Sequence, residues 1–166
     1  PDWLAVKPMS ATELAGQADC DSAALLRLLR GLTSLGICEH VEEDSFALTA
    51  LGAVLRTDSP SGLRSWAIWW GRHLWPTWSG LLHSVRTGHS AREHATGLVG
   101  YAHLQADSDS ASVFHTAMTE LTKLVAGEVV RHVDLSGIRH VVDVGGGHGE
   151  LLVSIMAAHP SLRGTV

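Results

Sequence analysis

The sequence predicts a mostly α-helical first part that contains one β-hairpin, followed by the first strand and helix of an α/β fold with a parallel sheet. Leucines recur at helical spacing between Leu25 and Leu35 and indicate an amphipathic helix. Two apolar runs that flank a turn at 43–45 indicate the hairpin. Residues 141–149, VVDVGGGHG, indicate a buried strand that leads through a glycine-rich turn into a helix.

The composition is that of a folded, core-forming chain. Of its 166 residues, 45% are hydrophobic and 17% are charged, which suits one domain or two small ones. No apolar run reaches the length of a membrane span, and no signal peptide opens the chain. Cys20 and Cys38 lack the spacing of metal ligands. We therefore expect a cytoplasmic protein with reduced thiols and no membrane partner.

The first sixty residues predict a winged helix-turn-helix. Ser10-Ala-Thr-Glu13 forms a capping box, which predicts a helix over 11–17. The leucine-rich helix follows and is expected to end at Gly36. Strands are expected over 37–42 and 46–49, so that two helices are followed by a hairpin.

The charge of this first part argues against nucleic-acid binding. The net charge of the chain is −5, and the whole acidic excess lies in residues 1–60. The expected hairpin carries four acidic residues within 39–44, whereas the leucine-rich helix offers only Arg27 and Arg30 as basic groups. DNA affinity depends on basic side chains that neutralise phosphates. We therefore expect no nucleic-acid partner and favour a winged helix used for packing or dimerisation, and an acidic winged-helix regulator remains an open alternative.

Tryptophans are concentrated in one window, because five of the six lie between residues 65 and 78. Trp66, Trp69 and Trp70 share one helical face, which favours a bulky core. The functional interpretation that remains open is an aromatic wall for a flat substrate, or a dimer contact.

Between the tryptophans and the glycine-rich turn, the sequence predicts a loop over 86–97, a short helix over 98–104 and a long helix over 111–133. Asp107-Ser-Asp109 is expected to cap the long helix. Three histidines fall near the expected loop: His83, His89 and His94. Their spacings place no pair on one helical face, so we expect no metal site.

The glycine-rich turn is the strongest candidate for a binding site. Three consecutive glycines, 145–147, let a ligand approach the bare backbone, and the N–H groups of the following helix point at the turn. The dinucleotide fingerprint fails because Glu150 stands where its third glycine belongs, and a P-loop would need a Lys-Ser/Thr pair that is absent here. What remains is an acidic-x-Gly-x-Gly-x-Gly pattern from Asp143 to Gly149. The helix is expected to stop at Pro160, and a second parallel strand is expected over 164–166.

This acidic-x-Gly-x-Gly-x-Gly pattern is similar to motif I of the S-adenosylmethionine-dependent methyltransferases. Over its whole length, the chain resembles the small-molecule O-methyltransferases of the plant-caffeate and bacterial-polyketide type. The matching segments occur in the family's order: SATELA with LLRLLRGLTSLGI, FALTALGAVLRTDSP, FHTAM and VVDVGGGHGELL. Each motif alone has modest specificity, whereas the ordered set is specific.

The resemblance implies a homodimer with two domains in each chain. Residues 1–106 correspond to a winged-helix dimerisation domain, and residues 107–166 correspond to a linking helix and the start of a Rossmann-like domain that binds S-adenosylmethionine. The implied cofactor-binding residues are Asp143, which could accept from the ligand's ammonium group, with Gly145, Gly146, Gly147, Gly149 and Thr122. The implied substrate-binding residues are Phe114 and Met118. His148 stands where the family is variable and is expected to face solvent.

The implied reaction transfers the methyl group of S-adenosylmethionine to a hydroxyl group of an aromatic or polyketide-like small molecule and releases S-adenosylhomocysteine. In the family, the histidine base and the acidic residue that holds the ribose lie beyond motif I, and no histidine of this chain matches the base motif. We therefore name no catalytic residue. We expect these 166 residues, as the N-terminal part of a longer enzyme, to be inactive alone. A homologue with altered chemistry, such as a hydroxylase or decarboxylase, remains an alternative.

Overall fold

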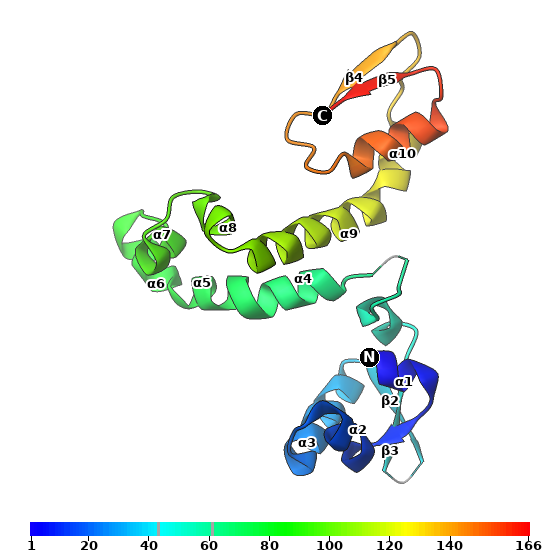
Figure 1. Cartoon of the computed structure of the whole chain (residues 1–166), viewed down its shortest axis with the longest axis vertical. Helices are drawn as coiled ribbons and strands as arrows, with labels where there is room; N and C mark the ends of the chain where they lie inside the picture. Colours follow the sequence, from blue (N-terminus) through cyan, green and yellow to red (C-terminus); the bar gives the residue numbers. More distant parts are fainter. Residues whose placement is uncertain (43, 61) are drawn as a thin grey trace. The chain divides into compact units, whose positions relative to one another are not determined.

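The computed structural model describes residues 1–166 apart from positions 43 and 61, and these residues form two compact units, Pro1–Arg64 and Ser65–Val166 (Figure 1). The tryptophan-rich helices group with the second unit, whereas the sequence placed them in a first domain that ends at residue 106. The domain boundary at 106 stays a prediction about the whole protein.

The first unit combines short helices with an antiparallel sheet in the strand order β1-β3-β2. Its elements are α1 (Asp2–Val6), β1 (Met9–Ser10), α2 (Ala11–Ala18), α3 (Ser22–Ser34), β2 (Cys38–Glu42), β3 (Ser45–Leu48) and the 3₁₀ helix η1 (Gly52–Leu55). Phe46 of β3 is 1% exposed and packs in a core with Leu14, Leu29 and Cys38. The two expected helices and the two strands of the hairpin are therefore confirmed.

Local capping explains why the helices of this unit begin where they do. The Ser10 hydroxyl accepts from the Glu13 N–H at 3.2 Å, and the Glu13 carboxylate accepts from the Ser10 N–H at 2.8 Å, so the predicted capping box is present. The Asp21 carboxylate accepts from the Ala24 N–H at 2.7 Å and starts α3. The turn expected at 43–45 includes a residue outside the described part of the chain.

The opening residues are tied into the first unit by contacts with segments far along the chain. They form α1 and β1, and Met9 of β1 pairs with Phe46 of β3. The Asp2 carboxylate accepts from the backbone N–H and the hydroxyl of Thr57, both at 2.8 Å. These long-range contacts leave no periodic signal in a segment of eight residues.

The second unit is mostly helical and ends in a strand–helix–strand unit (Figure 1). Its elements are α4 (Arg64–Trp69), the π-helix η2 (Trp70–Leu74), α5 (Trp75–Ser79), α6 (Leu81–Thr87), α7 (Ala91–Thr96), α8 (Ala102–Ala106), α9 (Ser108–His132), β4 (His140–Val142), α10 (Glu150–Ala158) and β5 (Arg163–Thr165). The long helix α9 is confirmed, and Asp107 caps it by accepting from the N–H groups of Asp109 and Ser110. None of the helices that the structure describes is both long and apolar enough to cross a membrane.

The loop expected over 86–97 is wrong. Helix α6 continues to Thr87, and α7 follows with Ser90 as its N-cap, whose hydroxyl accepts from the Glu93 N–H at 3.3 Å. Ser90 and Glu93 have the spacing of a capping box, which the glycines around them obscured. The short helix expected over 98–104 lies at 102–106 instead.

The tryptophan window divides between core and surface. Trp69 is 2% exposed and packs with Leu104 of α8 and Ala117 of α9, so the core interpretation is correct for this residue. Trp75 and Trp78 are exposed in the described part of the chain, at 72% and 55%. One helical face therefore does not account for the whole window.

The C-terminal residues form the expected parallel strand pair. Strands β4 and β5 are parallel, with Val141 opposite Gly164, and α10 connects them. The expectation that the strand extends through Val144 with both faces covered is wrong for the described residues, because β4 ends at Val142 and Val144 is 92% exposed. The described sheet has two strands, and the chain leaves it at Asp143, whose N–H still bonds the Thr165 carbonyl at 2.9 Å.

Candidate functional site

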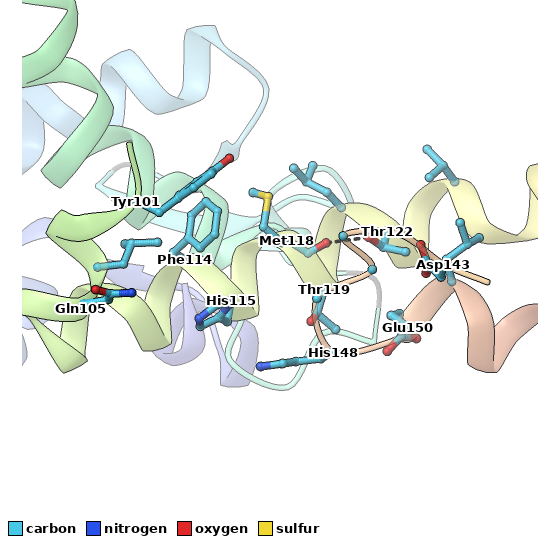
Figure 2. Close-up of a pocket in the computed structure, with 17 residues that line it drawn as sticks. Tyr101, Gln105, Phe114, His115, Met118, Thr119, Thr122, Asp143, His148 and Glu150 are labelled. Carbon is cyan, nitrogen blue, oxygen red and sulfur yellow. Dashed lines mark hydrogen bonds between the residues drawn. The ribbon is translucent and has the colours of Figure 1, made fainter. Parts of the chain in front are cut away.

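A cavity of about 780 Å³ lies in the second unit, between α8, α9 and the glycine-rich turn (Figure 2). Its lining residues are Tyr101, Leu104, Gln105, Phe114, His115, Met118, Thr119, Leu121, Thr122, Val125, Asp143, Gly145, Gly146, Gly147, His148, Glu150 and Leu151. This volume falls within the range of small-molecule sites, and the mixture of apolar walls with a few polar groups is typical of them.

Three glycines of the glycine-rich turn adopt backbone conformations that are strained for residues with a side chain. Gly145, Gly147 and Gly149 have φ values of 78°, 57° and 78°, in the left-handed region that favours glycine. They are the three glycines of the acidic-x-Gly-x-Gly-x-Gly pattern, so the spacing seen in the sequence reflects an alternation of backbone conformation. The Gly149 N–H closes the turn on the Gly146 carbonyl at 2.8 Å.

Gly146 is required for a different reason, which involves Asp143. A Cβ atom at position 146 would overlap the Asp143 carboxylate. The Oδ2 atom of Asp143 is buried and has no hydrogen-bond partner among the described residues. A buried carboxylate oxygen without a donor costs free energy, and a cationic donor such as an ammonium group would offset that cost.

The N-terminus of α10 adds backbone donors beside this carboxylate. Gly149 is the N-cap and supplies no side-chain acceptor, and the first intrahelical bond runs from the Val153 N–H to the Gly149 carbonyl at 2.8 Å. The N–H groups of the first turn therefore have no intrahelical acceptor. Together with Asp143, they give this end of the cavity both an anionic acceptor and neutral donors, which suits a ligand with an ammonium and a carboxylate group.

The opposite wall of the cavity comes from α8 and α9. Phe114 and Met118 are one turn apart on α9, and the ring of Tyr101, the N-cap residue of α8, lies 6.0 Å from the Phe114 ring. Aromatic rings and a thioether provide a wall for a flat apolar ligand. The lining residues in the described part of the chain include no tryptophan, so the tryptophan window does not contribute to this cavity, whose phenyl and phenol rings are those of Phe114 and Tyr101.

Thr122 lines the cavity one turn beyond Met118, but its hydroxyl hydrogen is already in use. The Thr122 hydroxyl donates to the Met118 carbonyl at 2.9 Å. It must rotate away from this bond to donate to a ligand carboxylate, and until then it can only accept.

The structure brings the residues singled out from the sequence to one place. Phe114, Met118, Thr122, Asp143 and the glycines 145–147 all line the same cavity. Gly149 does not line it and is buried behind the turn, where a Cβ atom would lie 3.0 Å from Val166. Their roles in binding a cofactor or a substrate stay predictions.

Several lining residues were missed by the sequence analysis. His115 and Thr119 directly follow Phe114 and Met118 on α9, so the same helical periodicity could have identified them. Tyr101 and Gln105 reach the cavity only because α8 packs on α9, and no local pattern shows this. His148 is exposed as expected, but it also lines the cavity, with its ring 4.9 Å from the His115 ring.

The histidines considered as metal ligands do not form such a site in the described residues. No group of three His, Cys, Asp or Glu side chains there could hold a metal ion. The rings of His83 and His94 nevertheless stack, with centroids 3.8 Å apart. Their sequence spacing did not predict this contact, because they lie on two separate helices, α6 and α7.

Comparison with known proteins relates this site to a family. The O-methyltransferase domain family matches residues 78–166. Phenazine O-methyltransferase of Lysobacter antibioticus is 34% identical over 163 residues, which are 98% of this chain and 48% of that protein. Aclacinomycin 10-hydroxylase of Streptomyces purpurascens is 36% identical over 157 residues, which are 92% of this chain and 42% of that protein.

Solved structures show the same relationship. The crystal structure of LaPhzM matches with a TM-score of 0.93 at 34% identity, over 99% of this chain and 50% of that one. An O-methyltransferase from neocarzinostatin biosynthesis, in complex with S-adenosylmethionine and 2-hydroxy-5-methyl naphthoic acid, matches with a TM-score of 0.77 at 33% identity, over 99% of this chain and 51% of that one. This chain spans about half the length of the curated relatives it matches, and its fold is the mostly helical N-terminal half of theirs. The chain belongs to the O-methyltransferase domain family.

Proposed function

We propose that the protein transfers the methyl group of S-adenosylmethionine to a hydroxyl group of an aromatic or polyketide-like small molecule. The observation that carries this proposal is the unpartnered Oδ2 of Asp143, which borders the same cavity as Phe114 and Met118. A site for a cationic amino-acid group and a wall for a flat acceptor are thus adjacent. Membership of the O-methyltransferase family supports the same conclusion.

In this proposal, each side of the cavity has its own task. Asp143 accepts from the ammonium group of the cofactor, and the glycines 145–147 allow its amino-acid portion to approach the backbone. Thr122 turns its hydroxyl toward the cofactor carboxylate. Phe114 and Met118 hold the acceptor ring, so that its hydroxyl oxygen is aligned with the methyl group.

When bound, S-adenosylmethionine supplies an electrophilic methyl group on a positively charged sulfur. The acceptor oxygen loses its proton to a base and forms the new carbon–oxygen bond as the carbon–sulfur bond breaks, which leaves S-adenosylhomocysteine. We assign the base to no residue among these 166. Residues 1–166 by themselves are therefore expected to bind the cofactor without turnover, and the winged-helix part to hold two copies of the whole protein together.

The test uses the whole protein and S-adenosylmethionine with a radiolabelled methyl group. A panel of hydroxybenzoates, hydroxynaphthoates and hydroxyphenazines should yield at least one labelled O-methyl product. The same assay on residues 1–166 alone should give none, and turnover by this fragment would refute its expected inactivity. Absence of cofactor binding by the whole protein would refute the proposed function.

A second candidate is a family member that keeps the cofactor but performs other chemistry. Its support is the 36% identity to a relative named as a hydroxylase. The residues of this cavity concern binding and do not distinguish the two reactions. Tight cofactor binding together with hydroxylated or decarboxylated products, and no methylated product in mass spectrometry, would favour this candidate.

A further inference from the structure

A row of rings crosses the cavity from the acceptor wall to the glycine-rich turn. Tyr101 lies 6.0 Å from Phe114, Phe114 lies 5.5 Å from His115, and His115 lies 4.9 Å from His148, measured between ring centroids. The Tyr101 ring comes from the N-cap of α8, the Phe114 and His115 rings come from α9, and the His148 ring comes from the turn itself. The two imidazoles therefore lie where the acceptor wall meets the turn.

The charges of the cavity are distributed unevenly. Among the described lining residues, His115 and His148 are the only ones that can carry a positive charge. The acidic lining residues are Asp143 and Glu150, and Figure 2 shows His148 between His115 and these two acids. The remaining ionisable group is the Tyr101 phenol. The acidic end of the cavity thus suits a cation, and the two imidazoles lie between that end and the acceptor wall.

Neither imidazole has a hydrogen-bond partner among the residues that the structure describes, and both rings are exposed. Their ring nitrogens are free to donate to a ligand. Two protonated imidazoles this close repel each other, and an anion that contacts both would relieve the repulsion. We infer that His115 and His148 together bind a carboxylate substituent of the acceptor and so select anionic aromatic acceptors over neutral ones. This inference rests on the proposed function and narrows its substrate class.

The test measures binding, so that it does not depend on methyl transfer. The probes are 1-naphthoate and its neutral methyl ester, titrated into the whole protein and into its H115Q/H148Q double variant under the same conditions. Loss of the two imidazole donors to the carboxylate should lower the affinity for 1-naphthoate at least about tenfold in the double variant. The affinity for the ester should be the same in both proteins.

A matched control is His132→Gln, an exposed histidine on α9 outside the cavity, which should behave as the wild type. Circular dichroism and thermal melting check that the variants fold. Equal affinities of the wild type and the double variant for 1-naphthoate, or an equal loss of affinity for the ester in the double variant, would overturn the inference. So would a double variant that loses affinity for S-adenosylhomocysteine alone, because the histidines would then serve the carboxylate of the cofactor. Failure of the proposed function would give a different result: the wild-type protein would not bind S-adenosylhomocysteine.

Discussion

The carboxylate of Asp143 lies against the Cα atom of Gly146, so that a methyl group at position 146 would overlap the carboxylate. The acid and the glycine are therefore a structural pair within the motif. The other glycines of the turn are explained by positive φ angles, whereas Gly146 is not among the residues with positive φ. Its hydrogen makes room for an anion that the described residues leave unpartnered.

Substitution of Gly146 by alanine should weaken cofactor binding. The added methyl group must displace either the Asp143 carboxylate or the turn, and overpacking of this kind costs about 1–3 kcal/mol. We expect the dissociation constant for S-adenosylhomocysteine, measured by calorimetry, to rise at least about tenfold. The control is Gly127→Ala on α9, where a Cβ atom would meet nothing within 4 Å; this variant should bind normally and gain up to about 1 kcal/mol of stability. Equal affinities of the two variants would contradict the explanation.

Substitution of Asp143 by asparagine should separate binding from stability. The shape is kept, but the negative charge that would pair with an ammonium group is lost. Hydrogen bonds to charged groups contribute about 1.5–3 kcal/mol, so the affinity for S-adenosylhomocysteine should fall roughly ten- to hundredfold. Because the carboxylate oxygen is buried without a donor, the melting temperature without ligand should stay the same or rise. The control is Asp109→Asn, at an exposed site outside the cavity, which should leave the affinity for S-adenosylhomocysteine unchanged. If the D143N variant bound S-adenosylhomocysteine as well as the wild type does, Asp143 would have no ionic role in binding.

The sequence predicted the elements that have a local cause. The capping box at Ser10, the cap at Asp107 and the glycine alternation all depend on residues within a few positions of one another, and each is present in the structure. The residues taken from the family resemblance also meet in one cavity, except Gly149.

Features that depend on packing between distant segments could not be predicted. Tyr101 reaches the cavity through the contact of α8 with α9, and the His115–His148 contact joins a helix to a turn far along the chain. The stack of His83 on His94 likewise joins two helices in a region that was expected to be a loop. Amino-acid spacing reports on a single element, so contacts between elements need the structure.

Removal of the Glu120 side chain should weaken the start of the tryptophan-rich helix. The Glu120 carboxylate on α9 accepts from the Ser65 N–H at 3.0 Å, the Ser65 hydroxyl at 2.8 Å and the Trp66 N–H at 3.2 Å. It thus satisfies donors of the first turn of α4 and places a negative charge at that helix terminus. We expect Glu120→Ala to lower the free energy of unfolding by about 2 kcal/mol, measured by urea unfolding with tryptophan fluorescence.

The matched control for Glu120 is Glu128→Ala on the same helix, an exposed residue paired with Arg131. Exposed ion pairs contribute about 0–1 kcal/mol, so this variant should lose little stability. If both variants lost the same amount, the contacts of Glu120 with α4 would have no special role.

Acidification should destabilise the second unit through His73. Its ring stacks on Trp69 at 4.2 Å, and its Nε2 lies 3.3 Å from the hydroxyl oxygen of Ser110. That hydroxyl donates to the Asp107 carboxylate at 2.5 Å, so Nε2 must be the donor to Ser110. Burial lowers the pKa of His73, helped by the positive charges of neighbouring basic groups and opposed by Asp107.

The unfolded chain therefore binds a proton at His73 more readily than the folded chain does. The contribution of His73 to stability is complete above about pH 6.5, falls as the pH drops below that value, and levels off below the lowered pKa of the folded state. Hydrogen bonds from Ser110 lower the pKa of Asp107, whose contribution changes only at more acidic pH. The test is urea unfolding of the wild type and of His73→Gln at pH values from 8 to 5, in which the variant should lose less stability than the wild type. The control is His89→Gln, at an exposed site, which should lose as much stability as the wild type. A variant with the full wild-type pH dependence would place the sensitivity at another group.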